Sequence, residues 1–167
     1  MDPDSINLGL FVLRVIVGVT LALHGIAKFR GGIRGVGNWF AAEGLRPGLL
    51  HAYLAALTEI GAGIGLALGL LTPLSAMAFI GVMTTAGWVG HRKNGFFIIR
   101  EGWEYVFVLA VAAAVVAATG PGDWSVDNAL GLDWSGPVWF VVAIAGGLVS
   151  TLLLLAAFYR PNAPSEQ

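Results

Sequence analysis

The chain alternates between long apolar runs and short connectors that carry most of its charge. Five apolar runs are present, at residues 8–29, 52–71, 74–90, 102–119 and 137–159. A helix needs about 20 residues to cross the roughly 30 Å hydrocarbon layer of a bilayer. A soluble helical bundle would instead need a polar face on each helix, and these runs leave almost none. The pattern therefore predicts an all-α integral membrane protein with five membrane-spanning helices.

The connectors differ in charge on the two sides of this predicted bundle. Lys28 lies at the edge of run one. Basic residues also lie between runs one and two and between runs three and four, namely Arg30, Arg34, Arg46, Arg92, Lys93 and Arg100. In the connector between runs four and five, all the charged residues are acids, namely Asp123, Asp127 and Asp133. Since Lys and Arg are enriched in cytoplasmic loops, we predict the N-terminus outside and the C-terminus inside, with a short cytoplasmic tail at residues 160–167.

Composition supports burial in lipid and removes several classes of function. Of the 167 residues, 57% are apolar and only 11% are charged, and a chain of this size buries only about 70% of its surface by folding. The net charge of −1 offers no basic surface for nucleic acid, so we expect membrane lipid as the surrounding partner. The absence of cysteine excludes a disulfide, a thiolate metal site or a cysteine nucleophile.

Five ionisable residues are predicted to converge near the cytoplasmic end of the bundle. At a rise of about 1.5 Å per residue, His24 lies about 7–8 Å inside the first helix and Glu59 about 10 Å inside the second. Lys28, His91 and Glu104 lie near the same membrane face. Charged side chains inside a membrane are expected to face the bundle interior and to find partners. The sequence thus predicts a polar cluster of His24, Lys28, Glu59, His91 and Glu104.

Each member of this cluster also has a purely structural interpretation. Lys28 can extend its ammonium to the headgroups, His91 can be an ordinary connector residue, and Glu104 can simply favour a helix N-terminus. Glu59 lies well inside its span, so it must be paired or protonated. Its two interpretations are a structural tie to Lys28 or His24, and a ligand-binding or proton-handling site built on the same residues.

Arg14 lies on the same face of the first helix but at another depth. It is about 12 Å along the axis from Glu59 and about 9 Å from the outer end, too far for a direct pair with Glu59. We expect Arg14 to form a structural ion pair with Asp127 or another acid of the outer connector.

Glycines suggest where helices approach one another closely. Gly61, Gly65 and Gly69 follow one another at intervals of four in the second apolar run, and small residues let membrane helices pack backbone to backbone. We predict a tight helix pair at this stripe, with a homo-oligomer face as the alternative. Gly18 and Gly25 on the first run offer another close approach. Residues 34–50 form a short amphipathic segment predicted to lie at the interface.

Familiar catalytic and metal-binding motifs are absent. The chain contains no GxGxxG, no Walker loop and no HExxH. We therefore expect no metal and no intrinsic cofactor, and we assign no catalytic residue from these patterns.

Several short motifs nonetheless resemble one family in their order along the chain. They are LRVIVG at residues 13–18, HGIAKF at 24–29, EIGAG at 59–63, LGLLTP at 68–73, WEY at 103–105, and GPG with SVD between 120 and 127. As a set, spanning about residues 8 to 132, they resemble the DoxX family of small bacterial membrane proteins. The resemblance implies a four-helix bundle over residues 1–132, with residues 137–159 as an additional helix, in the bacterial cytoplasmic membrane.

The resemblance also implies a link to redox chemistry. Relatives are associated with quinone-linked thiosulfate oxidation and with redox-stress complexes that include soluble partners. The resemblance implies that six residues occupy polar positions typical of the family, namely Arg14, His24, Lys28, Glu59, Glu104 and Asp127. We expect an accessory membrane subunit of a redox-linked complex, docking a protein partner at the basic connectors. The alternatives are a subunit that itself binds a quinone or another lipid, and a small transporter or lipid-handling protein.

The predicted orientation can be tested with a tag at each end of the chain. In intact spheroplasts, we expect external protease to remove the N-terminal tag and to spare the C-terminal tag, because the basic connectors hold their side in the cytoplasm. Immunoblotting of both tags measures the result. An N-terminal tag that stays protected until the membrane is opened would contradict the predicted orientation.

Overall fold

The computed structural model describes residues 2–161, and helices make up nearly all of its regular structure. The α-helices are α1 (Pro3–Arg30), α2 (Ile33–Ala42), α3 (Gly48–Leu68), α4 (Thr72–Ala86), α5 (Glu104–Thr119), α6 (Val126–Ala129) and α7 (Pro137–Phe158). A π-helical turn, η1 (Gly87–His91), and two 3₁₀ turns, η2 (Arg92–Asn94) and η3 (Ile98–Arg100), follow α4. Residues 162–167 of the predicted tail lie outside the described part.

The helical membrane architecture is confirmed, with one difference in helix length. Within the described residues, four helices are long and apolar enough to cross a membrane: α1, α3, α7 and the continuous stretch Thr72–Asn94. The fourth predicted span corresponds to α5, which is apolar but has only 16 residues. This is below the roughly 20 residues that a full crossing needs, so the crossing by α5 stays a prediction.

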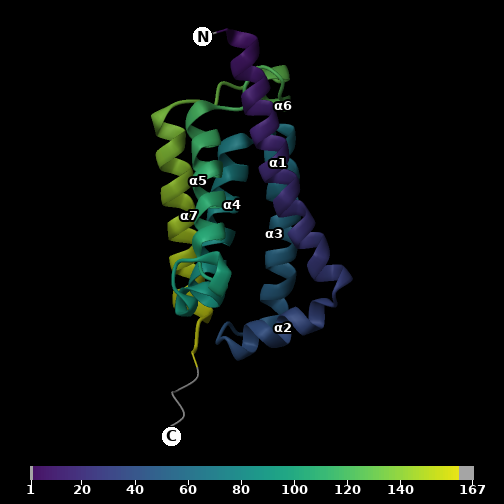
Figure 1. Ribbon diagram of the computed structural model, residues 1–167, viewed down its shortest axis with the longest axis vertical. Helices are drawn as coiled ribbons and strands as arrows, with labels where there is room; N and C mark the ends of the chain where they lie inside the picture. The colour runs from purple at the N-terminus through teal and green to yellow at the C-terminus, as the bar shows by residue number, and fades with distance from the viewer. Residues whose placement is uncertain (1, 162–167) are drawn as a thin grey trace, which may run out of the picture.

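The helices form two groups that stand side by side (Figure 1). One group is the antiparallel pair α1 and α3, and the other contains α4, α5 and α7. Helix α2 lies across one end of the bundle, here called the α2 end, and α6 lies at the opposite end, here called the α6 end. The chain starts at the α6 end and leaves α7 at the α2 end.

Glycines bring the backbones of α1 and α3 into contact, as predicted for Gly18 and Gly25 on α1, but the facing glycine of α3 is Gly63 and not one of the predicted stripe. A Cβ added to Gly63 would lie 2.5 Å from the carbonyl oxygen of Gly18, and one added to Gly25 would lie 2.5 Å from that of Ala56. Gly61 has no atom within 4 Å of such a Cβ, and Gly65 faces Ser75 of α4. The predicted stripe is therefore not the α1–α3 contact, because the crossing of the helices turns Gly63 toward α1.

The third glycine of that stripe ends its helix. Gly69 adopts a left-handed conformation, with φ of 64°, as the C-cap of α3. This conformation suits glycine, which has no Cβ to clash with the backbone. A side chain at Gly69 would also collide with Arg14, so the residue serves the turn at the α6 end.

Arg14 and Asp127 are both fully buried at the α6 end, yet the predicted ion pair between them does not form. Asp127 accepts hydrogen bonds from the backbone N–H of Leu71 (2.7 Å) and Thr72 (2.8 Å), and from the Thr72 hydroxyl (2.7 Å). Arg14 donates to the carbonyl oxygens of Ala67 (3.3 Å) and Trp124 (2.7 Å). Asp127 is thus satisfied at the positive N-terminus of α4, whereas Arg14 is held by one carbonyl near the C-terminus of α3 and by the closer Trp124 carbonyl in the connector before α6.

At the α2 end, the predicted amphipathic segment forms part of the folded core. Helix α2 covers residues 33–42, and residues 48–50 already belong to α3. Phe40 and Leu45 are buried in a small cluster with Ala52 and Val89. The chain after α7 closes this end, since Arg46 N–H donates to the carbonyl of Phe158 (3.0 Å) and Arg160 N–H donates to that of Gly44 (2.6 Å).

The glycine contacts give a test with a matched control on the same helix. Gly63→Ala places a methyl group against the backbone of α1, and we expect it to lower the free energy of unfolding by about 1–3 kcal/mol. Gly61→Ala enters open space and should change that free energy by less than about 0.5 kcal/mol. Unfolding in mixed detergent micelles measures both. Equal effects of the two substitutions would contradict the assigned contact.

Candidate functional site

A cavity of about 660 Å³ lies between the two helix groups, toward the α2 end. Residues from α1, α2 and α3 line one side, and residues from α4, α5 and α7 line the other. Most of the lining is apolar, including Leu21, Phe40, Leu54, Met77 and Leu109. The glycines hold α1 and α3 together as a pair. The cavity therefore lies between this pair and the second helix group, and not between α1 and α3.

One face of α3 supplies much of the wall. His51, Leu54, Ala55, Thr58 and Glu59 all line the cavity, and their spacing of three, four, seven and eight residues places them on a single helix face. At a rise of about 1.5 Å per residue, the two ionisable members are separated by about 12 Å along the axis. The wall thus carries a polar group at each end of an apolar stretch.

Lys28 and Glu59 form an ion pair on this wall. The Lys28 ammonium donates to both carboxylate oxygens of Glu59, at 2.7 and 2.5 Å. The Glu59 side chain is only 6% exposed and that of Lys28 is 22% exposed. Gly25 allows α1 to come close to Ala56 and Glu59, which brings the two charges together. Because isolated charges are costly inside a membrane, each charge depends on the other.

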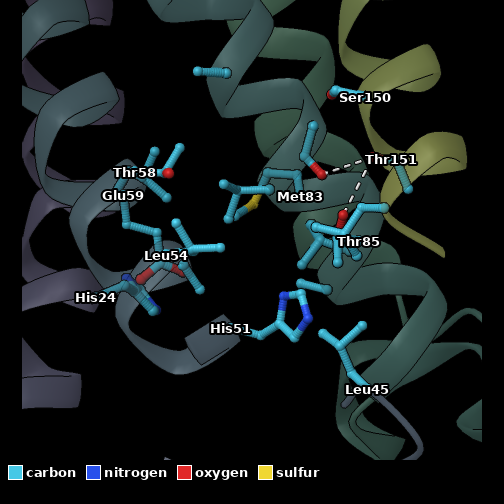
Figure 2. Close-up of a pocket in the computed structure, with 18 of the residues that line it drawn as sticks. His24, Leu45, His51, Leu54, Thr58, Glu59, Met83, Thr85, Ser150 and Thr151 are labelled. Atoms are coloured by element: carbon cyan, nitrogen blue, oxygen red, sulfur yellow. Dashed lines mark hydrogen bonds between the residues drawn. The ribbon is translucent and has the colours of Figure 1, made fainter. Parts of the chain in front are cut away.

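The two predicted histidines approach the cavity from different elements. His24 lies beside Glu59 (Figure 2), its Nδ1 is 2.8 Å from the carbonyl oxygen of Thr20, and its ring centre is 6.1 Å from that of Tyr105. His91 is in the π-helical turn η1 and also lines the cavity, with its Nδ1 2.7 Å from the carbonyl oxygen of Glu101. Each ring is therefore oriented by a backbone carbonyl.

Glu104 is the one member of the predicted cluster that does not line the cavity. It begins α5, and its carboxylate accepts a hydrogen bond from the backbone N–H of Ile98 at 2.9 Å. The acid therefore fixes the connector that contains η3. Within the described residues, no three His, Asp or Glu side chains gather as a group that could hold a metal ion.

The wall opposite the ion pair contains hydroxyl groups that the sequence analysis did not single out. Thr151 donates to the carbonyl oxygen of Gly81 (2.9 Å) and lies 3.2 Å from the hydroxyl of Thr85. Ser150 donates to the carbonyl oxygen of Gly147 (2.8 Å). Thr151 thus joins α7 to α4, whereas the bond of Ser150 lies within α7, and all of these hydroxyls already have protein partners. The positions of these hydroxyl residues within two apolar runs do not predict the hydrogen bonds, because most of the partners are backbone carbonyls.

His51 was also missed, and among the described residues that line the cavity it is the one whose buried polar atoms are unpaired. The residue is 3% exposed, and neither ring nitrogen has a hydrogen-bond partner among the described residues. Figure 2 shows the ring directed into the cavity, which Met83 and Thr85 also line. The apolar pattern predicts that the second helix starts at residue 52, which places His51 in a connector. Its spacing of eight residues from Glu59 is the signal that could have revealed it.

Comparison with known proteins identifies the family. The family model named DoxX matches residues 9–92, which is 84 of the 167 residues. The chain belongs to the DoxX family. It is also 34% identical over 102 residues to the "Putative oxidoreductase CatD" of Bacillus subtilis (strain 168), an alignment that covers 57% of this chain and 75% of that relative. The search of solved structures found no match.

The residues matched by the family model include part of the cavity wall. The matched range runs from α1 through η1 and so includes His24, Lys28, His51, Glu59 and His91. It ends well before residue 132, where the motif resemblance was drawn, and does not include α5, α6 or α7. The lysine, glutamate and histidine side chains at the cavity are thus contributed by the DoxX region of this multi-pass membrane protein, whereas Tyr105 is contributed by α5.

The two salt bridges among the described residues allow a direct comparison of buried and exposed charge. Lys28→Met leaves Glu59 buried without its partner, and we expect a loss of about 3 kcal/mol in the free energy of unfolding. Lys93→Met breaks the exposed pair with Glu43, in which Lys93 is 62% exposed, and should cost less than about 1 kcal/mol. Unfolding in mixed micelles measures both variants.

A double variant separates the burial of a lone charge from loss of packing. Replacing Lys28 and Glu59 together by Met removes both charges, so we expect most of the stability lost in Lys28→Met to return. If the double variant is no more stable than Lys28→Met, the stability does not depend on the pairing of these two charges.

Proposed function

We propose that this DoxX protein is a membrane subunit of a redox-linked complex and that it binds a quinone or quinol in the cavity. The main support is a largely apolar cavity of about 660 Å³ with a Lys28–Glu59 ion pair on its wall. The name of the Bacillus subtilis relative, which contains the word oxidoreductase, agrees with a redox role. The structure favours this hypothesis over a purely accessory role because an accessory subunit needs no internal space.

The size and lining of the cavity suit a lipophilic ring. Pockets for small molecules usually have volumes of about 300–1,000 Å³ and apolar walls with a few convergent polar groups. A quinone has a flat ring with polar oxygens and an apolar tail, so it matches both parts of this lining. Such a ligand is already dissolved in the bilayer that surrounds the helices.

The residues at the cavity can handle the protons of quinone reduction. Conversion of a quinone to a quinol consumes two electrons and two protons. The Lys28 ammonium can donate a hydrogen bond to a ring oxygen, while the Glu59 carboxylate can accept a proton and pass it on. His24 and His91 are the candidates for exchanging that proton with the surroundings, because each imidazole can both bind and release one.

The electrons are supplied by a partner protein in this proposal. The chain has no cysteine and hence no internal dithiol. Lys93, Arg92 and Arg100 lie in the connector after α4, and the same connector exposes Phe97 (64%) and Ile99 (90%). Basic and apolar side chains together suit a protein contact, so we propose this connector, on the cytoplasmic side, as the docking surface. This surface also favours the accessory role as the second candidate function.

Filling the cavity tests the proposed function. Ala55 lines the cavity, and Ala55→Phe should lower the affinity for decyl-ubiquinone at least tenfold by occupying the space for its ring. Ala27 is exposed on the outside of α1 and does not line the cavity, so Ala27→Phe is the matched control and should bind like the wild type. Quenching of tryptophan fluorescence in nanodiscs gives the dissociation constants, since Trp39 lines the cavity.

Two results would contradict the proposal. One is a wild-type protein whose fluorescence is not quenched saturably by the quinone. The other is Ala55→Phe binding as tightly as the wild type, which would place the ligand outside this cavity.

A further inference from the structure

His51 is a buried polar group that the protein leaves without a hydrogen bond. Its side chain is at the α2 end of the cavity, beneath Leu54 and beside Leu45 (Figure 2). One face of the ring meets the edge of Phe158, with ring centres 4.9 Å apart. The backbone of Arg46 lies nearby but completes no hydrogen bond to either ring nitrogen. Buried polar groups usually have a partner, so an exception calls for an explanation.

The neighbouring polar groups cannot supply that partner because they are already engaged. Lys28 and Glu59 bind each other, and the hydroxyls of Ser150 and Thr151 donate to backbone carbonyls. Most of the remaining cavity wall is aliphatic or aromatic, including Phe40, Leu45 and Leu54. Leaving a buried donor or acceptor unpaired is unfavourable, and a ligand in the cavity is the remaining source of a hydrogen bond.

A neutral imidazole suits a ligand that exists in two oxidation states. One ring nitrogen donates and the other accepts, and the two tautomers exchange these roles. His51 can therefore donate to a carbonyl oxygen of an oxidised ring and accept from a hydroxyl of the reduced ring. A lysine could only donate, and a carboxylate could only accept.

The position of His51 fixes the kind of ligand. It lies on the same face of α3 as Glu59, about 12 Å away along the axis, with the apolar side chains of Leu54 and Ala55 between them. We propose that His51 is the second polar contact of the ligand, opposite the Lys28–Glu59 pair. The ligand then carries hydrogen-bonding oxygens on two opposite edges of its ring, as a para-quinone and its quinol do. This inference rests on the proposed function.

Two substitutions separate the hydrogen-bonding capacity of the His51 side chain from the shape of its ring. His51→Phe keeps an aromatic ring against Phe158 but removes both nitrogens, and we expect the affinity for decyl-ubiquinone to fall roughly 3- to 10-fold. His51→Gln keeps a donor and an acceptor and should stay within about threefold of the wild type. His51→Phe should be at least as stable as the wild type without ligand, because it no longer buries unpaired nitrogens.

The outcomes distinguish this inference from the proposed function. If the wild type binds the quinone and His51→Phe binds equally well, or if both variants weaken binding equally, His51 is not a hydrogen-bonding contact. If the wild type binds no quinone, the proposed function itself fails.

A measurement on the unmodified protein covers the case in which a variant does not fold. With ¹⁵N-labelled histidine, binding of decyl-ubiquinone should shift the ring-nitrogen resonances of His51 in the direction of a new hydrogen bond. Unchanged His51 resonances in the saturated complex would overturn the inference.

Discussion

The ion pair between Lys28 and Glu59 depends on the backbone contact between α1 and α3. Gly18, Gly25 and Gly63 let the two helices approach until backbone atoms touch, which sets the depth of Lys28 relative to Glu59. In lipid, apolar side chains gain little from meeting each other, so such close packing and polar contacts hold helices together. The same contact fixes α1 and α3 as one unit and leaves the cavity between that unit and α4, α5 and α7.

The two ends of the bundle satisfy their buried polar groups in different ways. At the α6 end, Asp127 accepts from N–H groups at the start of α4, and Arg14 donates to carbonyls of α3 and of the connector before α6, which leaves one unpaired nitrogen, Nε of Arg14. Arg14 lines neither the cavity of about 340 Å³ at this end nor the larger cavity at the α2 end. At the α2 end, both ring nitrogens of His51 are unpaired beside the cavity. The combination of space and unused hydrogen bonds distinguishes the α2 end as the candidate binding end.

The sequence predicted the parts of this arrangement that depend on side-chain type and helical spacing. It located the apolar helices and suggested a tie between Glu59 and Lys28, because a carboxylate that deep in a membrane needs a nearby cation. It did not predict the partners of Arg14 and Asp127, since these are backbone groups that every residue carries. It also chose Gly61 instead of Gly63, because the face of α3 that meets α1 depends on how the helices cross. His51 was missed because the helix start was placed at residue 52, four residues after the start of α3 at Gly48.

Helix α7 shows why the cavity cannot be deduced from the family region alone. The resemblance suggested that residues 137–159 are an addition to a four-helix core, but α7 packs against α4 and lines the cavity with Ser150, Thr151 and Leu154. Its last residue, Phe158, meets His51 and bonds to the backbone of Arg46. The region matched by the family model provides the charged wall, and α5 and α7 provide much of the wall that faces it. A ligand that fits between them would be recognised through groups of the DoxX region and confined by helices outside it.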